Sequence, residues 1–314
     1  MSETLILILF NVFIVAMLML DLGIVQRRAH FPGMKEAIGW SALWITLALA
    51  FDVFLWIELG QVKALEFLTG YLVEQALSVD NVFVFILILT YFAVPHEVQH
   101  RVLFWGVLSA IIFRAIFIVL GAALVAKFHW ILYILGGFLV LTAIKLAIQK
   151  ETKVRPERNP FVNFARKIFP MTKTYEGGRF FVRHDGKTLM TPLFLVLVMI
   201  ETTDIAFATD SIPAIFAITQ DTIIIYTSNI FAVLGLRSLY FVVAGFMQEF
   251  RYLKYGLSVV LAFIGVKMLI EVWVDIHILL SLIIIFGIIT ISVISSIVAD
   301  KKTARKGNAR TEAS

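Results

Sequence analysis

The sequence predicts an all-α polytopic membrane protein, on three observations. Of its 314 residues, 60% are hydrophobic and only 16% are charged, and the mean hydropathy is +0.93. The apolar residues are gathered in runs of about 20, long enough for a helix to cross the hydrocarbon core of a bilayer. Inside these runs, acidic residues recur with one spacing in two places, at Glu74 and Asp80 and again at Asp204 and Asp210.

Nine apolar runs are long enough to be membrane-spanning helices. Arg27 and Arg28 follow the first run instead of preceding it, so we interpret it as a retained span and not as a cleaved signal peptide. The nine runs cover residues 5–25, 38–57, 67–92, 102–126, 129–149, 191–218, 223–247, 254–272 and 277–299.

The distribution of Lys and Arg predicts the topology, because cytoplasmic loops carry an excess of basic residues. With the N-terminus outside and the C-terminus in the cytoplasm, 21 of the 27 basic residues fall on the cytoplasmic side. Residues 150–190 are then a basic cytoplasmic loop between the fifth and sixth spans, which fixes topology and contacts anionic lipid. Residues 300–314 are predicted as a disordered cytoplasmic tail.

The composition also limits the chemistry. The sequence contains no cysteine, which excludes disulfides and thiolate ligands, so any metal is held by oxygen or imidazole. A net charge of +5 with a pI near 9.3 follows from the basic cytoplasmic segments, and we expect no nucleic-acid partner. No His-Glu-x-x-His or Gly-x-Gly-Asp motif occurs, so we do not expect an enzyme.

Two segments of three helices resemble each other. Glu74 and Asp80 lie 130 positions before Asp204 and Asp210, and Arg114 lies 123 positions before Arg237. An odd number of spans separates the copies, so they are predicted to be inverted in the membrane, as in many secondary transporters. The predicted organisation is two N-terminal helices (1–58), repeat 1 (65–149), the loop, repeat 2 (191–272) and a last helix (277–299).

The spacing of the acids constrains how they bind an ion. On an unbroken helix, residues six apart point about 120° apart and are separated by about 9 Å along the axis, so Asp204 and Asp210 cannot chelate one ion together. Two arrangements remain open. The helix unwinds between them, which Pro213 favours because it frees the carbonyl of Thr209. Alternatively, each acid binds with partners from the other repeat, which the inversion favours.

The candidate ligands are all oxygen donors, which suit Mn²⁺, Ca²⁺ or Mg²⁺ better than soft metals. The candidate metal ligands are Glu74, Asp80, Asn81, Asp204, Thr209, Asp210 and Ser211. Supporting roles fall to Glu201 as a ligand or proton carrier, to Arg114 and Arg237 as partners of the acids, and to Ser78 and Pro213. The competing interpretation is an ion-pair network that holds helices together without transport. Two arginines cannot neutralise five acids, and ionisable residues inside a membrane usually serve a function.

The residues Glu74, Ser78-Val79-Asp80-Asn81 and Asp210-Ser211-Ile212-Pro213 resemble the motifs of the TerC family of integral membrane proteins, most closely its Alx branch. The resemblance covers nearly the whole chain. It implies a LysE-like transporter that exports manganese from the bacterial cytoplasm across the inner membrane, with a link to tellurite resistance. It also implies that Glu74, Asp80, Asp204 and Asp210 hold the metal.

We therefore expect a transporter that exports Mn²⁺ in exchange for protons carried by the same carboxylates, with the metal as substrate and no prosthetic group. The expected partners are a divalent metal ion and membrane lipid, and the sequence predicts no oligomeric state. The alternatives are transport of another solute, such as Ca²⁺, a tellurium species or an amino acid, and a membrane scaffold that transports nothing.

Overall fold

The computed structural model describes residues 2–24, 33–148, 156–184, 186–245, 253–271, 273–274 and 276–311. The basic residues Arg27, Arg28, Lys150, Lys153, Arg155 and Arg251, which helped to predict the topology, lie outside these ranges. The helices are α1 Glu3–Ile24, α2 Met34–Leu59, α3 Gln61–Tyr91, α4 His96–Lys127, α5 Ile131–Ile148, α6 Pro160–Ile168, α7 Pro192–Phe216, α8 Thr222–Gly245, α9 Leu253–Ile270 and α10 Ile278–Thr311.

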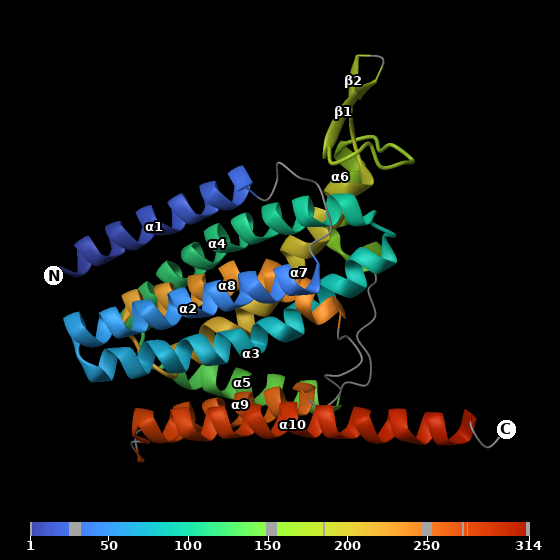
Figure 1. Cartoon of the computed structure of the whole chain (residues 1–314). Coiled ribbons are helices and arrows are strands. Elements are labelled where there is room, and N and C mark those ends of the chain that lie inside the picture. The colour runs from blue at the N-terminus through green and yellow to red at the C-terminus, as the bar shows by residue number, and fades with distance from the viewer. Residues whose placement is uncertain are drawn as a thin grey trace.

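The nine predicted spans all fall on helices, and the helix bundle is the main body of the molecule (Figure 1). Within the described residues, seven helices are long and apolar enough to cross a membrane: α2, α3, α4, α5, α7, α8 and α10. The polytopic all-α fold is therefore confirmed. Crossing by α1, a shorter apolar helix, and by α9 stays a prediction.

The connection between α2 and α3 is shorter than predicted. Gly60 alone separates Leu59 from Gln61, with φ at 92°, a conformation that favours glycine because it has no side chain. Its N–H donates to the carbonyl of Trp56, which closes the end of α2. Helix α3 consequently starts six residues before its predicted apolar run, at Gln61 instead of residue 67.

Two predicted irregular segments contain regular structure. Residues 156–190 form a 3₁₀ turn (Pro156–Arg158), helix α6, and an antiparallel hairpin of β1 (Phe181–His184) and β2 (Lys187–Met190). Asn159 caps α6, because its side-chain oxygen accepts from the backbone N–H of Phe161 at 2.9 Å and of Val162 at 3.2 Å. In the structure α10 continues to Thr311, twelve residues beyond the predicted end of the last span at residue 299, and the disorder of residues 300–314 stays a prediction. Residues 312–314 lie outside the described ranges.

Helices α3 and α8 form the centre of the bundle and pack against each other, while α4 packs on α7 and α5 on α9. The contact between α5 and α9 is a close backbone approach. A Cβ atom at Gly265 would lie 2.9 Å from the carbonyl oxygen of Gly136, closer than side chains normally come. Small residues at such crossings let the helix backbones approach closely and gain van der Waals contact. This packing matters in a membrane because the hydrophobic effect does not drive helices together in lipid. This contact fixes α5 beside α9.

Candidate functional site

One arginine joins four helices in the interior of the bundle. Arg114 of α4 is completely buried, with an exposed fraction of 0%, and its guanidinium donates to Glu74 of α3. It also holds Asp204 of α7 by two contacts, of 3.3 Å from Nε and 3.1 Å from Nη2. Nη1 donates to the side-chain oxygen of Asn229 on α8 at 3.2 Å. Glu74 and Asp204 therefore share one cation, which can balance only one negative charge.

Helix α7 does not unwind between its two acids. It is continuous from Pro192 to Phe216, with Pro213 inside it, so the first of the two predicted arrangements, unwinding between Asp204 and Asp210, is not found. A continuous helix turns residues six positions apart about 120° away from each other. Asp204 accordingly faces Arg114, whereas Asp210 lines a separate pocket. Glu74 and Asp80 are divided in the same way on α3, which is also continuous.

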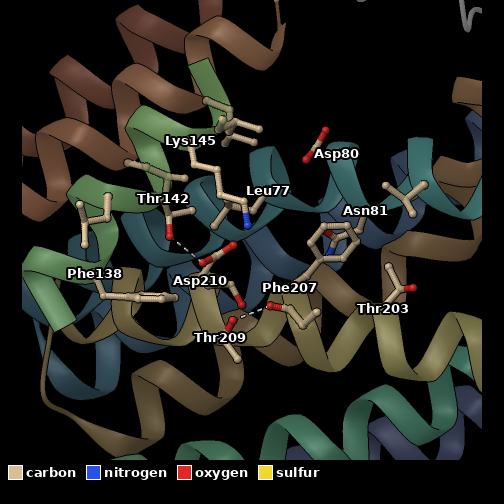
Figure 2. A pocket seen from close by; sticks show the side chains of 17 residues that line it. Leu77, Asp80, Asn81, Phe138, Thr142, Lys145, Thr203, Phe207, Thr209 and Asp210 are labelled. Atoms are coloured by element: carbon tan, nitrogen blue, oxygen red, sulfur yellow. Dashed lines mark hydrogen bonds between the residues drawn. The ribbon is translucent and has the colours of Figure 1, made fainter. Parts of the chain in front are cut away.

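The second pair of acids, Asp80 and Asp210, lines a pocket between α3, α5, α7 and α9. Its volume is about 540 Å³, large enough for an ion with several water molecules. Figure 2 shows Asp80 coming from one side of the pocket and Asp210 from another. The polar lining residues are Asp80, Asn81, Thr142, Lys145, Thr203, Thr209, Asp210 and Ser211, and the apolar remainder includes Phe138 and Phe207.

Each acid of this pocket has a basic neighbour. The Thr142 hydroxyl donates to Asp210 at 3.1 Å, and the Lys145 amine is directed toward the same carboxylate (Figure 2). Lys254, in the first turn of α9, lies close enough to Asp80 for an electrostatic interaction. The two carboxylates also repel each other across the pocket. Lysines from α5 and α9 therefore act electrostatically on the two acids of the pocket.

Ser211 connects the Arg114 cluster with the pocket. It lines the pocket next to Asp210 and also lies beside Glu74. Its buried hydroxyl interacts with the Glu74 carboxylate, whereas the buried hydroxyl of Ser78 on α3 has no hydrogen-bond partner among the residues that the structure describes. Buried polar atoms of this kind are usually satisfied by water. The pocket and the cluster are thus neighbouring parts of one polar interior.

The remaining predicted residues lie around these two centres. Thr209 lines the pocket, and its hydroxyl donates to the carbonyl of Ala206 in its own helix at 2.6 Å. Glu201 lies outside the pocket lining, partly buried against Gly106 of α4. Arg237 lies on α8 and is partly buried, and its predicted pairing with an acid of the site stays a prediction.

The predicted four-carboxylate cluster is not assembled in this structure. Within the described ranges, no three His, Asp or Glu side chains come together closely enough to hold a metal ion. Three further residues of the site, Thr142, Lys145 and Asn229, were not predicted from the sequence. A lysine inside an apolar run is unusual, and this could have indicated Lys145 as a site residue. Thr142 lies three residues earlier, on the same face of the helix.

Comparisons with known proteins identify relatives over most of the chain. Residues 59–304 match the family model described as "Integral membrane protein TerC family". A protein of Myxococcus xanthus named "Uncharacterized membrane protein STKORF319" is 48% identical over 292 residues, 93% of this chain and 92% of that protein. A protein of Salmonella typhi named "Putative membrane-bound redox modulator Alx" is 48% identical over 294 residues, 91% of each chain. No solved structure matches.

Proposed function

The chain belongs to the TerC family of integral membrane proteins, and on this premise we propose that it exports Mn²⁺ from the bacterial cytoplasm. The observation that carries the proposal is the pocket, because Asp80 and Asp210 reach it from equivalent positions of two helices. Carboxylates in a membrane interior are costly, and their presence in a cavity is typical of an ion pathway.

The donor set supports a hard divalent cation. Asp80 and Asp210 supply charged oxygens, and Asn81, Thr142 and Ser211 supply neutral ones. Oxygen ligands with open positions for water suit Mn²⁺, and also Ca²⁺ and Mg²⁺. We assign the ion to Asp80 and Asp210. We do not assign the ion to Glu74 and Asp204, because Arg114 is bound to both of their carboxylates. Their direct binding of the metal stays a prediction.

The proposal includes an inverted repeat of α3–α5 and α7–α9, in a molecule of nine spans whose N-terminus is outside. Two features support it. Following the chain in Figure 1, each of α3, α4 and α5 runs opposite to its counterpart α7, α8 and α9. A two-fold axis that relates the repeats would also make the contact of α3 with α8 equivalent to the contact of α7 with α4, and would pair α5 with α9. All three pairs of helices are in contact. Such folds bind substrate near the midplane, where the repeats meet.

Transport by the purified full chain in proteoliposomes tests the proposed function. We expect saturable Mn²⁺ uptake by molecules whose cytoplasmic side faces the external buffer. An acidic lumen should accelerate it, because carboxylates exchange protons for metal. Empty liposomes give the background rate. Faster flux of Ca²⁺ than of Mn²⁺ would favour the calcium alternative, and the absence of any metal flux would contradict the transporter and favour a scaffold.

Lys145 is expected to compete with the metal for Asp210, because both are cations directed to one carboxylate. Replacing Lys145 by methionine should therefore lower the apparent KM for Mn²⁺ roughly tenfold, equivalent to about 1.4 kcal/mol. Lys267→Met is the matched control, since Lys267 does not line the pocket. The proposed competition is wrong if Lys145→Met leaves the KM unchanged or raises it.

The name of the Salmonella relative suggests a second possibility, a role in membrane redox balance. This chain has no cysteine, so it offers no thiol for disulfide exchange. The acidic pocket instead favours ion movement as the primary activity. The link to tellurite resistance implied by the family resemblance is compatible with either role.

A further inference from the structure

Residues 156–190, here called the loop module, carry an exposed apolar stripe. Phe161, Phe164 and Ile168 of α6 have exposed fractions of 60%, 63% and 50%. Their spacing of three and four residues places them along one face of the helix. The neighbouring face, with Val162 and Ala165, is buried against the bundle. Three large apolar side chains are thus displayed next to the membrane-spanning helices.

The loop module is also strongly basic at its surface. It contains seven basic and three acidic residues, and all seven basic side chains are exposed: Arg158, Arg166, Lys167, Arg179, Arg183, Lys173 and Lys187. Two of the acids are engaged locally. Glu157 accepts a hydrogen bond from Tyr91 at 3.1 Å, and Glu176 lies 2.9 Å from the ring of His184. Positive charge therefore dominates what the module presents.

The module lies beside the bundle, at the end where α4 and α7 begin. Figure 1 shows β1 and β2 projecting across the direction of the long helices instead of continuing along it. If those helices cross the bilayer, the module lies parallel to the membrane surface. Side chains at this level meet the lipid headgroups and the ends of the acyl chains.

We propose that the loop module binds the anionic phospholipid surface of the membrane that the bundle spans. The apolar stripe of Phe161, Phe164 and Ile168 enters the interface, and the basic side chains contact lipid phosphates. An apolar face combined with basic residues is the pattern of helices that lie in a membrane interface. Basic side chains close to an anionic surface are attracted to its phosphates, and this attraction falls off within a Debye length.

The attachment is coupled to the helix that carries Asp204 and Asp210. The Asn159 side chain, which caps α6, donates to the hydroxyl of Thr202 on α7 at 2.7 Å. The Tyr175 hydroxyl donates to the carbonyl of Phe92, after α3, at 2.7 Å. Burial raises the pKa of Tyr175 to about 12, so this donor stays protonated at physiological pH. Lipid bound to the module therefore restrains the C-terminal end of α3 and the middle of α7 at Thr202.

Site-specific labelling of the full chain in lipid nanodiscs tests this proposal. Because the chain has no native cysteine, a thiol-reactive label attaches only at the introduced cysteine. Phe164→Cys is labelled with an environment-sensitive fluorophore, with Asn163→Cys on the polar face of the same helix as the matched control. In nanodiscs containing phosphatidylglycerol, brominated acyl chains should quench the Phe164 label at least severalfold more than the Asn163 label. Pure phosphatidylcholine, or 1 M salt, should reduce this difference because charge attraction is lost or screened.

Equal quenching at the two positions would overturn the proposal, as would a Phe164 label that stays in water in every lipid. A label that is shielded only in native membranes, and not in pure lipid, would also overturn it and would indicate a protein partner instead. A second variant, Arg179→Gln with Arg183→Gln and Lys187→Gln, leaves α6 intact and should lose the dependence on phosphatidylglycerol. These readouts do not involve metal, so they remain valid even if the transport proposal fails.

Discussion

Replacing Asp80 or Asp210 by asparagine is expected to lower the rate of Mn²⁺ transport at least about 100-fold. Even residues that only orient metal ligands cost 10- to 100-fold when changed, and these two are assigned as ligands themselves. Asparagine keeps the shape of the side chain but removes the charge that compensates the desolvation of the cation. Each variant would also leave a lysine, Lys254 or Lys145, without its acidic neighbour. Initial uptake rates in proteoliposomes measure the effect.

Asp52→Asn is the matched control for this experiment, because Asp52 is a partly buried acid of α2 that does not line the pocket. It should transport at a rate close to that of the wild type. Gel filtration in detergent should show equal amounts of folded protein for all three variants. Wild-type transport by both Asp80→Asn and Asp210→Asn would refute the assignment of the ion to this pocket.

Replacing Arg114 by methionine is expected to destabilise the protein by about 3–5 kcal/mol, because it leaves Glu74 and Asp204 buried without their cation. Arg114→Lys should recover only part of this loss. A lysine ammonium cannot reproduce the planar fork that reaches Glu74, Asp204 and Asn229 together. The stabilities of the variants are compared by heating each one in detergent and measuring, by gel filtration, the temperature at which the monodisperse peak is lost.

A triple variant separates charge from packing in this cluster. Arg114→Met combined with Glu74→Gln and Asp204→Asn removes all three charges together, and we expect it to be markedly more stable than Arg114→Met alone. If Arg114→Met by itself is as stable as the wild type, the cluster does not hold α3, α4 and α7 together. If the triple variant is no better than the single one, loss of shape instead of charge explains the effect.

The sequence indicated the class and much of the layout of this molecule. Apolar runs of bilayer length located every long helix, because the cost of exposing backbone and polar groups to lipid leaves few alternatives. It missed α6, the hairpin and the helical extension of α10, since these segments are polar and depend on local caps and neighbours instead of a long apolar run. The single-glycine connection at Gly60 was missed for a similar reason, because a positive φ leaves no pattern in hydropathy.

The spacing of the acids was determined by the sequence alone, and so was its geometric consequence, that Asp204 and Asp210 cannot chelate one ion from a straight helix. Only the tertiary structure decided how this conflict is resolved. Helix α7 stays continuous, so the two acids lie on different faces of it: Asp204 contacts Arg114, and Asp210 lines the pocket. Which side chains meet there depends on packing between helices far apart in sequence. That is why Lys145 and Thr142 become neighbours of Asp210 only in the folded protein.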